Sequence, residues 1–324
     1  MEQQELAKWF EDGELFVRLN DSGQIFDLGD AHDSTTASPW NRLNEVSYLE
    51  RLGPIHSSDF GNEHFTKLKG FERLSDILLM HCGVNGAGFD VLQTLPNLEK
   101  LWCRLWHNAD ESLGYIGCAT TLKQLGLNGS YGITDAGMPG LSHLSNLEYL
   151  SLQYTSISKG IAVVEQLPSL ATLSIVCTAV GDDEMQSISQ VKSLEKLYLP
   201  HHFTDKGLAK IVSLPNLISL AIGGAFSAGA IADLARTRSL RELNIWNSEL
   251  DDDAVRELGK LKHLRKVWAD DATLTTQQGE YLARKLERCD FRRFEREGRR
   301  SCEWTMNRQF KYQEWLDAGG RRIP

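Results

Sequence analysis

Residues 122–127 read Leu122-Lys123-Gln124-Leu125-Gly126-Leu127, and this spacing of leucines returns at regular intervals along the chain. The steps between successive L-x-x-L-x-L patterns are 24, 24, 25, 23, 24, 23, 23 and 24 residues. Self-similarity at such a period predicts a stack of equivalent units, each of which buries its apolar face only against its neighbours. The patterns begin at Leu74, Leu98, Leu122, Leu147, Leu170, Leu194, Leu217, Leu240 and Leu264.

The second half of the repeat is also periodic. Residues 133–138 read Ile-Thr-Asp-Ala-Gly-Met, residues 203–208 read Phe-Thr-Asp-Lys-Gly-Leu, and residues 157–161 and 250–255 are looser versions. The combined pattern resembles the leucine-rich repeat family, in its short bacterial form similar to the cysteine-containing repeats. The resemblance covers about residues 74–288. It implies an α/β solenoid, a right-handed horseshoe with a parallel sheet on the concave face and helices outside.

Segments at both ends are expected to cap the array. Residues 1–42 are predicted to hold a helix with Leu6, Trp9 and Phe10 on one face, a hairpin turning at residues 20–23, and a loop. A degenerate first repeat is predicted at Leu43-x-x-Val46-x-Tyr48, so the array spans 43–288. Residues 289–324 are basic and aromatic, and are interpreted either as a cap or as a docking tail.

Composition narrows the classes of partner. The net charge is −9, but from residue 284 onward 12 Lys and Arg stand against 7 Asp and Glu, which leaves −14 for the preceding residues. An acidic body disfavours nucleic acid and favours a basic protein as partner. No apolar run could span a membrane, and the acidic amino terminus lacks a secretory signal, so we expect a cytoplasmic protein, with signal-independent export left open.

The six cysteines form no C-x-x-C pair, which predicts buried, reduced thiols rather than a disulfide framework or a zinc site. No motif for a cofactor, a nucleotide or a small-molecule substrate is present. Cys177 and His201 occupy the same column of adjacent repeats and are the best candidates for a weak hydrolase, but they lack an acid to orient the histidine. His201, His202 and Asp205 are poor metal ligands because adjacent residues of an extended chain point to opposite faces. We therefore predict a protein that is not an enzyme.

The register assigns three outward positions of each strand to the concave face, because side chains alternate across a strand. Large aromatic side chains stand at several of these positions, and interfaces between proteins use Trp and Tyr as anchors. We therefore predict that a partner protein binds the concave face, in the role of a scaffold, an inhibitor or immunity protein, or an effector. A targeting subunit of an enzyme complex is the alternative. The predicted binding residues are Trp102, Arg104, Asn128, Tyr149, Gln153, Tyr198, Asn244, Trp246, Trp268 and Asp270.

Overall fold

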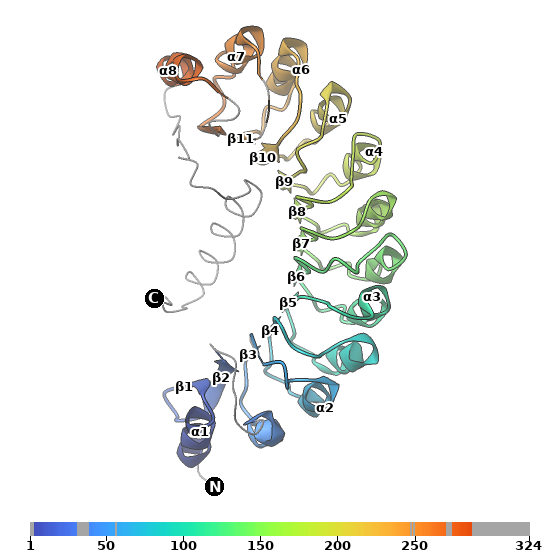
Figure 1. Cartoon of the computed structure of the whole chain (residues 1–324), viewed down its shortest axis with the longest axis vertical. Coiled ribbons are helices and arrows are strands. Elements are labelled where there is room, and N and C mark those ends of the chain that lie inside the picture. Colours follow the sequence, from blue (N-terminus) through green and yellow to red (C-terminus); the bar gives the residue numbers. More distant parts are fainter. Residues whose placement is uncertain are drawn as a thin grey trace.

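A computed structural model of the chain describes residues 3–30, 39–55, 57–246, 248, 250–269 and 274–286. These residues form an arc with strands on its inner side and helices on its outer side (Figure 1). A single 12-stranded sheet runs from β1 to β12 in chain order. Only β1 is antiparallel to its neighbour, and every other described pair is parallel. The predicted α/β solenoid with a parallel sheet on the concave face is confirmed.

The strands are short, because each repeat gives only three or four residues to the sheet. The bounds are β1 Leu15–Leu19, β2 Ile25–Asp30, β3 Arg51–Gly53, β4 Asp76–Leu79, β5 Lys100–Cys103, β6 Gln124–Gly126, β7 Tyr149–Ser151, β8 Thr172–Ser174, β9 Lys196–Tyr198, β10 Ser219–Ile222, β11 Glu242–Ile245 and β12 Lys266–Ala269.

The predicted outer helices are of two kinds, since several repeats carry a 3-10 helix where others carry an α-helix. Repeats of the same 24-residue length, from Leu74 and from Leu98, carry a 3-10 helix and an α-helix respectively, so the length of the repeat does not set the kind of helix. The α-helices are α1 Gln3–Asp12, α2 Asn62–Phe65, α3 Ala109–Ile116, α4 Met185–Ile188, α5 Asp205–Ile211, α6 Ala228–Asp233, α7 Asp252–Leu258 and α8 Thr276–Lys285. The 3-10 helices are η1 Pro39–Glu45, η2 Thr66–Leu68, η3 Gly86–Thr94, η4 Met138–Leu141, η5 Lys159–Gln166 and η6 Leu234–Arg236. None of the helices in the described ranges is long and apolar enough to span a bilayer.

The strand register agrees with the leucine spacing. Leu125 pairs with Leu101 on one side and with Leu150 on the other, and all three side chains are fully buried. One residue further along, Gly126 pairs with Trp102 and with Ser151, on the opposite face of the sheet. The inner leucines therefore form one continuous core, and the alternate residues form the concave wall.

The amino-terminal hairpin is confirmed, with β1 and β2 flanking the turn at residues 20–23. The predicted first repeat at Leu43 is wrong, because Leu43 lies in η1 and the strand β3 comes later, with Leu52 paired to Leu28. The repeat actually begins at Leu49, 25 residues before Leu74, and needs no insertion. The helix α1 buries Leu6 and Phe10 but leaves Trp9 36% exposed.

At the carboxy-terminal end, the helix α8 follows the last strand, β12. Thr275 caps it by accepting a bond from the backbone N–H of Gln278, whose side chain bonds back to Thr275. The predicted cap or docking tail at residues 289–324 lies outside the described residues.

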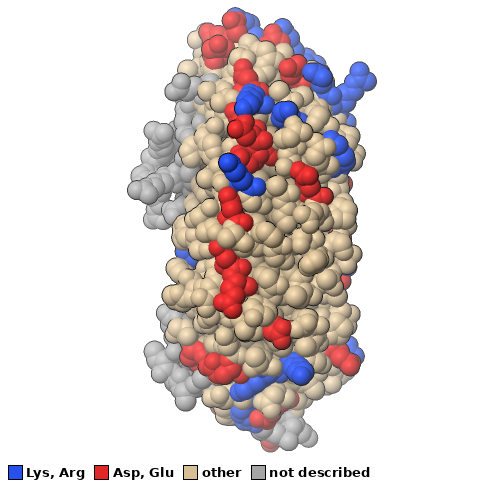
Figure 2. Space-filling model, turned by 90° about the vertical axis from the view of Figure 1, so that its right-hand side faces the viewer, with Lys and Arg blue, Asp and Glu red and all other residues tan. Residues whose placement is uncertain are grey.

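Consecutive repeats are joined by carboxylates on the loops that enter the outer layer. Asp110 accepts bonds from the backbone N–H and the hydroxyl of Thr134, at 2.8 and 2.6 Å. Asp135 does the same for Ser158, at 2.7 and 2.9 Å, and also accepts from Gly160 N at 2.8 Å. Each carboxylate therefore accepts from donors at the start of the following outer segment and ties that segment to the repeat before it. Figure 2 shows Asp and Glu side chains aligned along the outer side of the arc.

Candidate functional site

A first aromatic cluster lies on the concave wall across β5, β6 and β7. The ring of Trp102 lies over Gly126 so closely that a Cβ atom at residue 126 would be 2.0 Å from the ring. Beyond the glycine, the ring reaches Tyr149, with 5.3 Å between the ring centroids. The glycine in the middle strand thus allows the indole to lie over that strand and to contact Tyr149 beyond it.

A second cluster lies further along the wall, over β8 to β11. Val176, Ala221 and Trp246 form an apolar group separate from the main core, with Tyr198 packed against them. The ring of Trp246 also lies 5.6 Å from that of His201. An apolar cluster on the solvent side of a repeat sheet does not contribute to the core that holds the repeats together.

Polar side chains separate the two clusters. The hydroxyl of Ser151 donates to the side-chain oxygen of Asn128 at 2.5 Å, and this oxygen also accepts from Gln153 N at 3.2 Å. The amide nitrogen of Gln153 donates to the hydroxyl of Ser174 at 2.9 Å. Small and amide side chains therefore hold this part of the wall in a fixed arrangement.

The structure brings the predicted residues to one wall but differs in how accessible they are. Trp102, Tyr198 and Trp268 are half-buried and present part of their surface to solvent. Tyr149 and Trp246 are only 8% and 5% exposed, contrary to their prediction as exposed anchors. The leucine spacing predicted their face of the sheet correctly, but it could not show that neighbouring side chains pack against them and reduce their exposure. Gln153 is likewise only 4% exposed, whereas Asn244 is half-buried like the three accessible aromatic residues. Asp270 lies outside the described residues.

Arg104 extends the first cluster toward the rim formed by the loops after the strands. Its guanidinium carbon lies 4.1 Å from the ring centroid of Trp106 and 5.8 Å from that of Tyr131. Its Nε also donates to Gly129 O at 3.1 Å. Trp106 and Tyr131 are 47% and 59% exposed. The strand register did not select these two residues because they follow the strand, and their only signal in the sequence is a large aromatic residue in a loop.

A row of alternating charges crosses the amino-terminal part of the wall. Asp27 lies between Arg18 and Arg51, with N···O distances of 3.7 and 4.0 Å, and Arg51 reaches Asp76 at 3.6 Å. Burial raises the pKa of Asp27 and of Asp76 above their ordinary values, although the positive charge of Arg51 opposes this shift. The row links the first strands to one another on the face opposite the core.

The alternative catalytic and metal sites gain no support. Cys177 has a left-handed backbone with φ of 57° and packs against the second cluster. The His201 ring faces Trp246, and the Nε2 atom of His202 lies 2.9 Å from Val180 O. In the part of the chain that is described, no group of three or more His, Cys, Asp or Glu side chains is placed to hold a metal ion.

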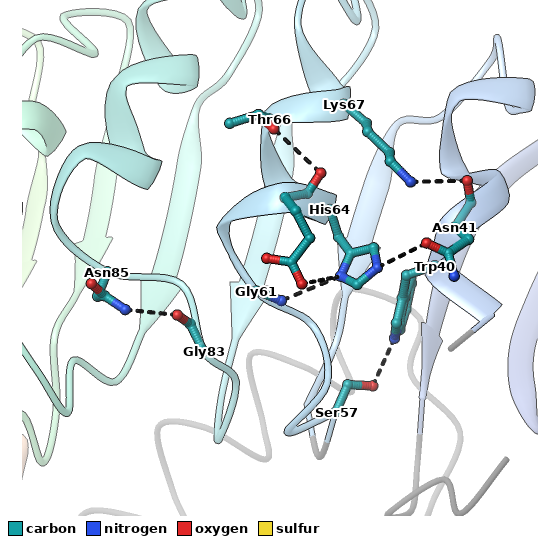
Figure 3. A network of polar contacts seen from close by, with 10 residues as sticks. Trp40, Asn41, Ser57, Gly61, His64, Thr66, Lys67, Gly83 and Asn85 are labelled. Carbon is teal, nitrogen blue, oxygen red and sulfur yellow. Dashed lines mark hydrogen bonds and ion pairs between the residues drawn. The ribbon is translucent and has the colours of Figure 1, made fainter. Parts of the chain in front are cut away.

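A polar network near the amino-terminal end was not predicted (Figure 3). The buried His64 lies between Asn41 and Gly61, with Nε2 3.3 Å from Asn41 Oδ1 and Nδ1 accepting from Gly61 N at 3.4 Å. The indole of Trp40 donates to Ser57 Oγ at 3.0 Å. These contacts attach η1 to the first repeats. His64 is the third residue of α2, and its ring accepts from the backbone N–H of Gly61, which directly precedes the helix.

Comparisons with known proteins place the fold but not a specific activity. The chain resembles the crystal structure of an internalin from Listeria monocytogenes, with a TM-score of 0.50 and 17% identity, covering 82% of this chain and 86% of that one. Over 96 residues, it is 38% identical to a provisionally named adenylate cyclase regulatory protein of Trypanosoma equiperdum. That match covers 29% of this chain and 15% of the other protein. No family model matches the chain. The fold is that of a leucine-rich repeat solenoid.

Proposed function

We propose that this chain binds a partner protein on the concave wall, and that it acts by binding rather than by catalysis. The observation that carries the proposal is the pair of aromatic clusters on the face opposite the core, where they lie outside the main core of leucines. Trp and Tyr anchor interfaces between proteins because they bury much area and lose few rotamers.

The half-buried residues Trp102, Tyr198 and Trp268 are the proposed anchors, since each has surface left for a partner to cover. Tyr149 contacts the ring of Trp102, and Trp246 belongs to the cluster against which Tyr198 packs. The hydrogen-bonded amides of Asn128 and Gln153 keep the surface between the clusters preorganised, and preorganisation reduces the entropy lost on binding. Arg104, Asn244 and Asp270 complete the proposed set.

The charges on the concave wall indicate the charge expected of the partner's binding surface. The acidic composition favoured a basic partner, but the described outward positions of the strands carry more basic than acidic side chains. We infer that the concave wall suits a partner surface that is neutral or acidic, and that a basic partner would suit the outer side, where acidic side chains align. The basic wall residues are Arg18, Arg51, Lys100, Arg104, Lys196 and Lys266, and the acidic ones are Asp27, Asp76 and Glu242.

The cellular role is proposed at the level of regulation. The partial similarity to a regulatory protein favours a subunit that targets or modulates an enzyme, alongside the scaffold, inhibitor and effector roles.

Cys82, Cys103 and Cys118 are free thiols, which supports a reducing compartment such as the cytoplasm. Burial raises the pKa of the Cys82 thiol to about 11, so this thiol is protonated at neutral pH. Cys118 is exposed, which corrects the prediction that the cysteines are buried.

The test is a triple substitution of Trp102, Tyr198 and Trp268 to Ala. The partner is first isolated with the unmodified chain, and its affinity is then measured by calorimetry for each variant. Loss of at least about 100-fold in affinity is expected, because each aromatic anchor contributes about 1 kcal/mol or more.

The matched control is Ile218→Ala, which removes a 40% exposed apolar side chain that is at none of the proposed wall positions. This variant should bind the partner with unchanged affinity. Full binding by a triple variant that keeps the melting temperature of the parent would disprove the proposal.

A further inference from the structure

The amino-terminal hairpin pairs with β3 through β2, and its other strand, β1, forms the edge of the sheet. In the described residues, β1 is the last strand of the sheet and pairs only with β2. A terminal strand presents one row of backbone N–H and C=O groups that is ready to pair with another strand. Folded proteins usually protect such an edge with charges, proline or a covering segment.

Exposed apolar side chains are concentrated at this end. Six large hydrophobic side chains in the described residues are well exposed, and three of them, Trp9, Phe16 and Leu19, lie within the first 19 residues. Phe16 and Leu19 belong to β1 and are 42% and 39% exposed. Trp9 is on α1, which packs against β1. The edge is therefore flanked by exposed apolar side chains, and Arg18 is the one charged residue of β1.

The strand β1 is chemically symmetric about its middle residue, Val17. Leu15 and Val17 contact the core, whereas Phe16 and Arg18 lie on the other face, with the guanidinium carbon 5.0 Å from the centre of the Phe16 ring. If a second β1 pairs antiparallel with the first about Val17, each Leu15 lies opposite a Leu19 and each Phe16 lies opposite an Arg18. This arrangement joins apolar residues to apolar residues and a cation to an aromatic ring, and it keeps like charges apart.

We propose that two copies of this chain pair through the outer edge of β1, with a twofold axis at Val17 that joins their sheets into one. The pairing is isologous, since the same strand serves both copies. Arg18, which reaches Asp27 in its own chain at 3.7 Å, would then lie between that carboxylate and the partner's aromatic ring. The two concave walls remain open, so the dimer would present two copies of the proposed binding surface.

The first experiment measures the mass of the full chain by sedimentation equilibrium up to about 100 µM, where a specific interface of ordinary affinity is occupied. A dimer is expected. Phe16→Lys and Leu19→Lys should each raise the dissociation constant at least tenfold, because a lysine on an edge strand opposes pairing. The control Ile218→Lys changes a side chain that is 40% exposed elsewhere and should leave the dimer intact.

The second experiment tests the register by oxidative crosslinking. A mixture of Phe16→Cys and Arg18→Cys chains should form a disulfide between residues 16 and 18, because directly opposite residues are within the range of a disulfide. Either variant alone should give only the background of the parent chain. A parent chain that is monomeric at every concentration, a dimer unaffected by both lysine variants, or crosslinking of either variant with itself overturns the proposal. Since these variants leave the proposed anchors Trp102, Tyr198 and Trp268 unchanged, failure here does not bear on the proposed binding function.

Discussion

At the scale of single residues, the repeat motif Thr-Asp-x-Gly acts between repeats rather than within one. Asp135 follows the threonine of its own repeat, but its carboxylate accepts bonds from Ser158 and Gly160 of the next. Partial burial raises the pKa of Asp135, whereas these bonds lower it and outweigh the burial, so its pKa lies below the ordinary 3.8. The glycine of the motif leaves room for the aspartate of the preceding repeat, since a Cβ atom at Gly137 would lie 2.5 Å from Asp110 Oδ1.

Asp135→Ala is expected to lower the free energy of unfolding by about 1–2 kcal/mol at pH 7, as for the loss of a capping side chain. Because the folded state lowers the pKa, this contribution is present above the unfolded pKa and is lost as the pH falls through the folded pKa. Urea unfolding at pH 7 and near pH 3 measures both. An equal difference between variant and parent at the two pH values would contradict the assignment.

The matched control is Asp183→Ala. The Asp183 carboxylate forms an exposed ion pair with Lys206, and the hydrogen bond from Lys206 lowers its pKa. This surface pair should contribute less than Asp135, and salt should weaken it further.

At the scale of elements, two glycines in and at the end of α3 differ in how closely the next repeat packs against them. Gly114 lies inside α3, and a Cβ there would have nothing within 4 Å. Gly117 ends the same helix, and a Cβ there would be 1.8 Å from Gly140 O of the next repeat. The outer layer therefore packs backbone against backbone at Gly117, while Gly114 faces open space.

Gly114→Ala is expected to stabilise the protein by about 0.5–1 kcal/mol, because alanine favours the helix and restricts the unfolded chain. Gly117→Ala should destabilise it by about 1–3 kcal/mol, the usual cost of overpacking. Thermal unfolding of the two variants distinguishes them, and a shift of the same sign for both would show that the packing of α3 against η4 is wrong.

At the scale of the whole molecule, stability is distributed along the array because each repeat covers the core of its neighbours. Leu150 is fully buried between Leu125 and Leu173. Leu150→Asp places an unpaired carboxylate in this core, at a cost above about 4 kcal/mol. We expect several neighbouring repeats to lose hydrogen-exchange protection together, while Ile218→Asp, at a 40% exposed position, loses none. A loss confined to residues 147–170 would contradict a continuous core.

The leucine period alone determined the solenoid, the strand register and which residues face the concave wall. A period of 23 to 25 residues and alternation along a strand leave one arrangement that buries every leucine. The start of the array was misread, because Leu43 and Val46 imitate the pattern locally, and only the pairing of Leu28 with Leu52 shows the true frame.

Tertiary structure alone decided how accessible each wall residue is. Trp102 spans a neighbouring strand because residue 126 is a glycine, and Trp246 is covered in part by Val176 and Ala221 from other repeats. The position of Arg104 between Trp106 and Tyr131 likewise depends on loops of two repeats. A one-dimensional pattern fixes the direction of a side chain, whereas its exposure depends on side chains from other repeats, and these become neighbours only when the chain is stacked.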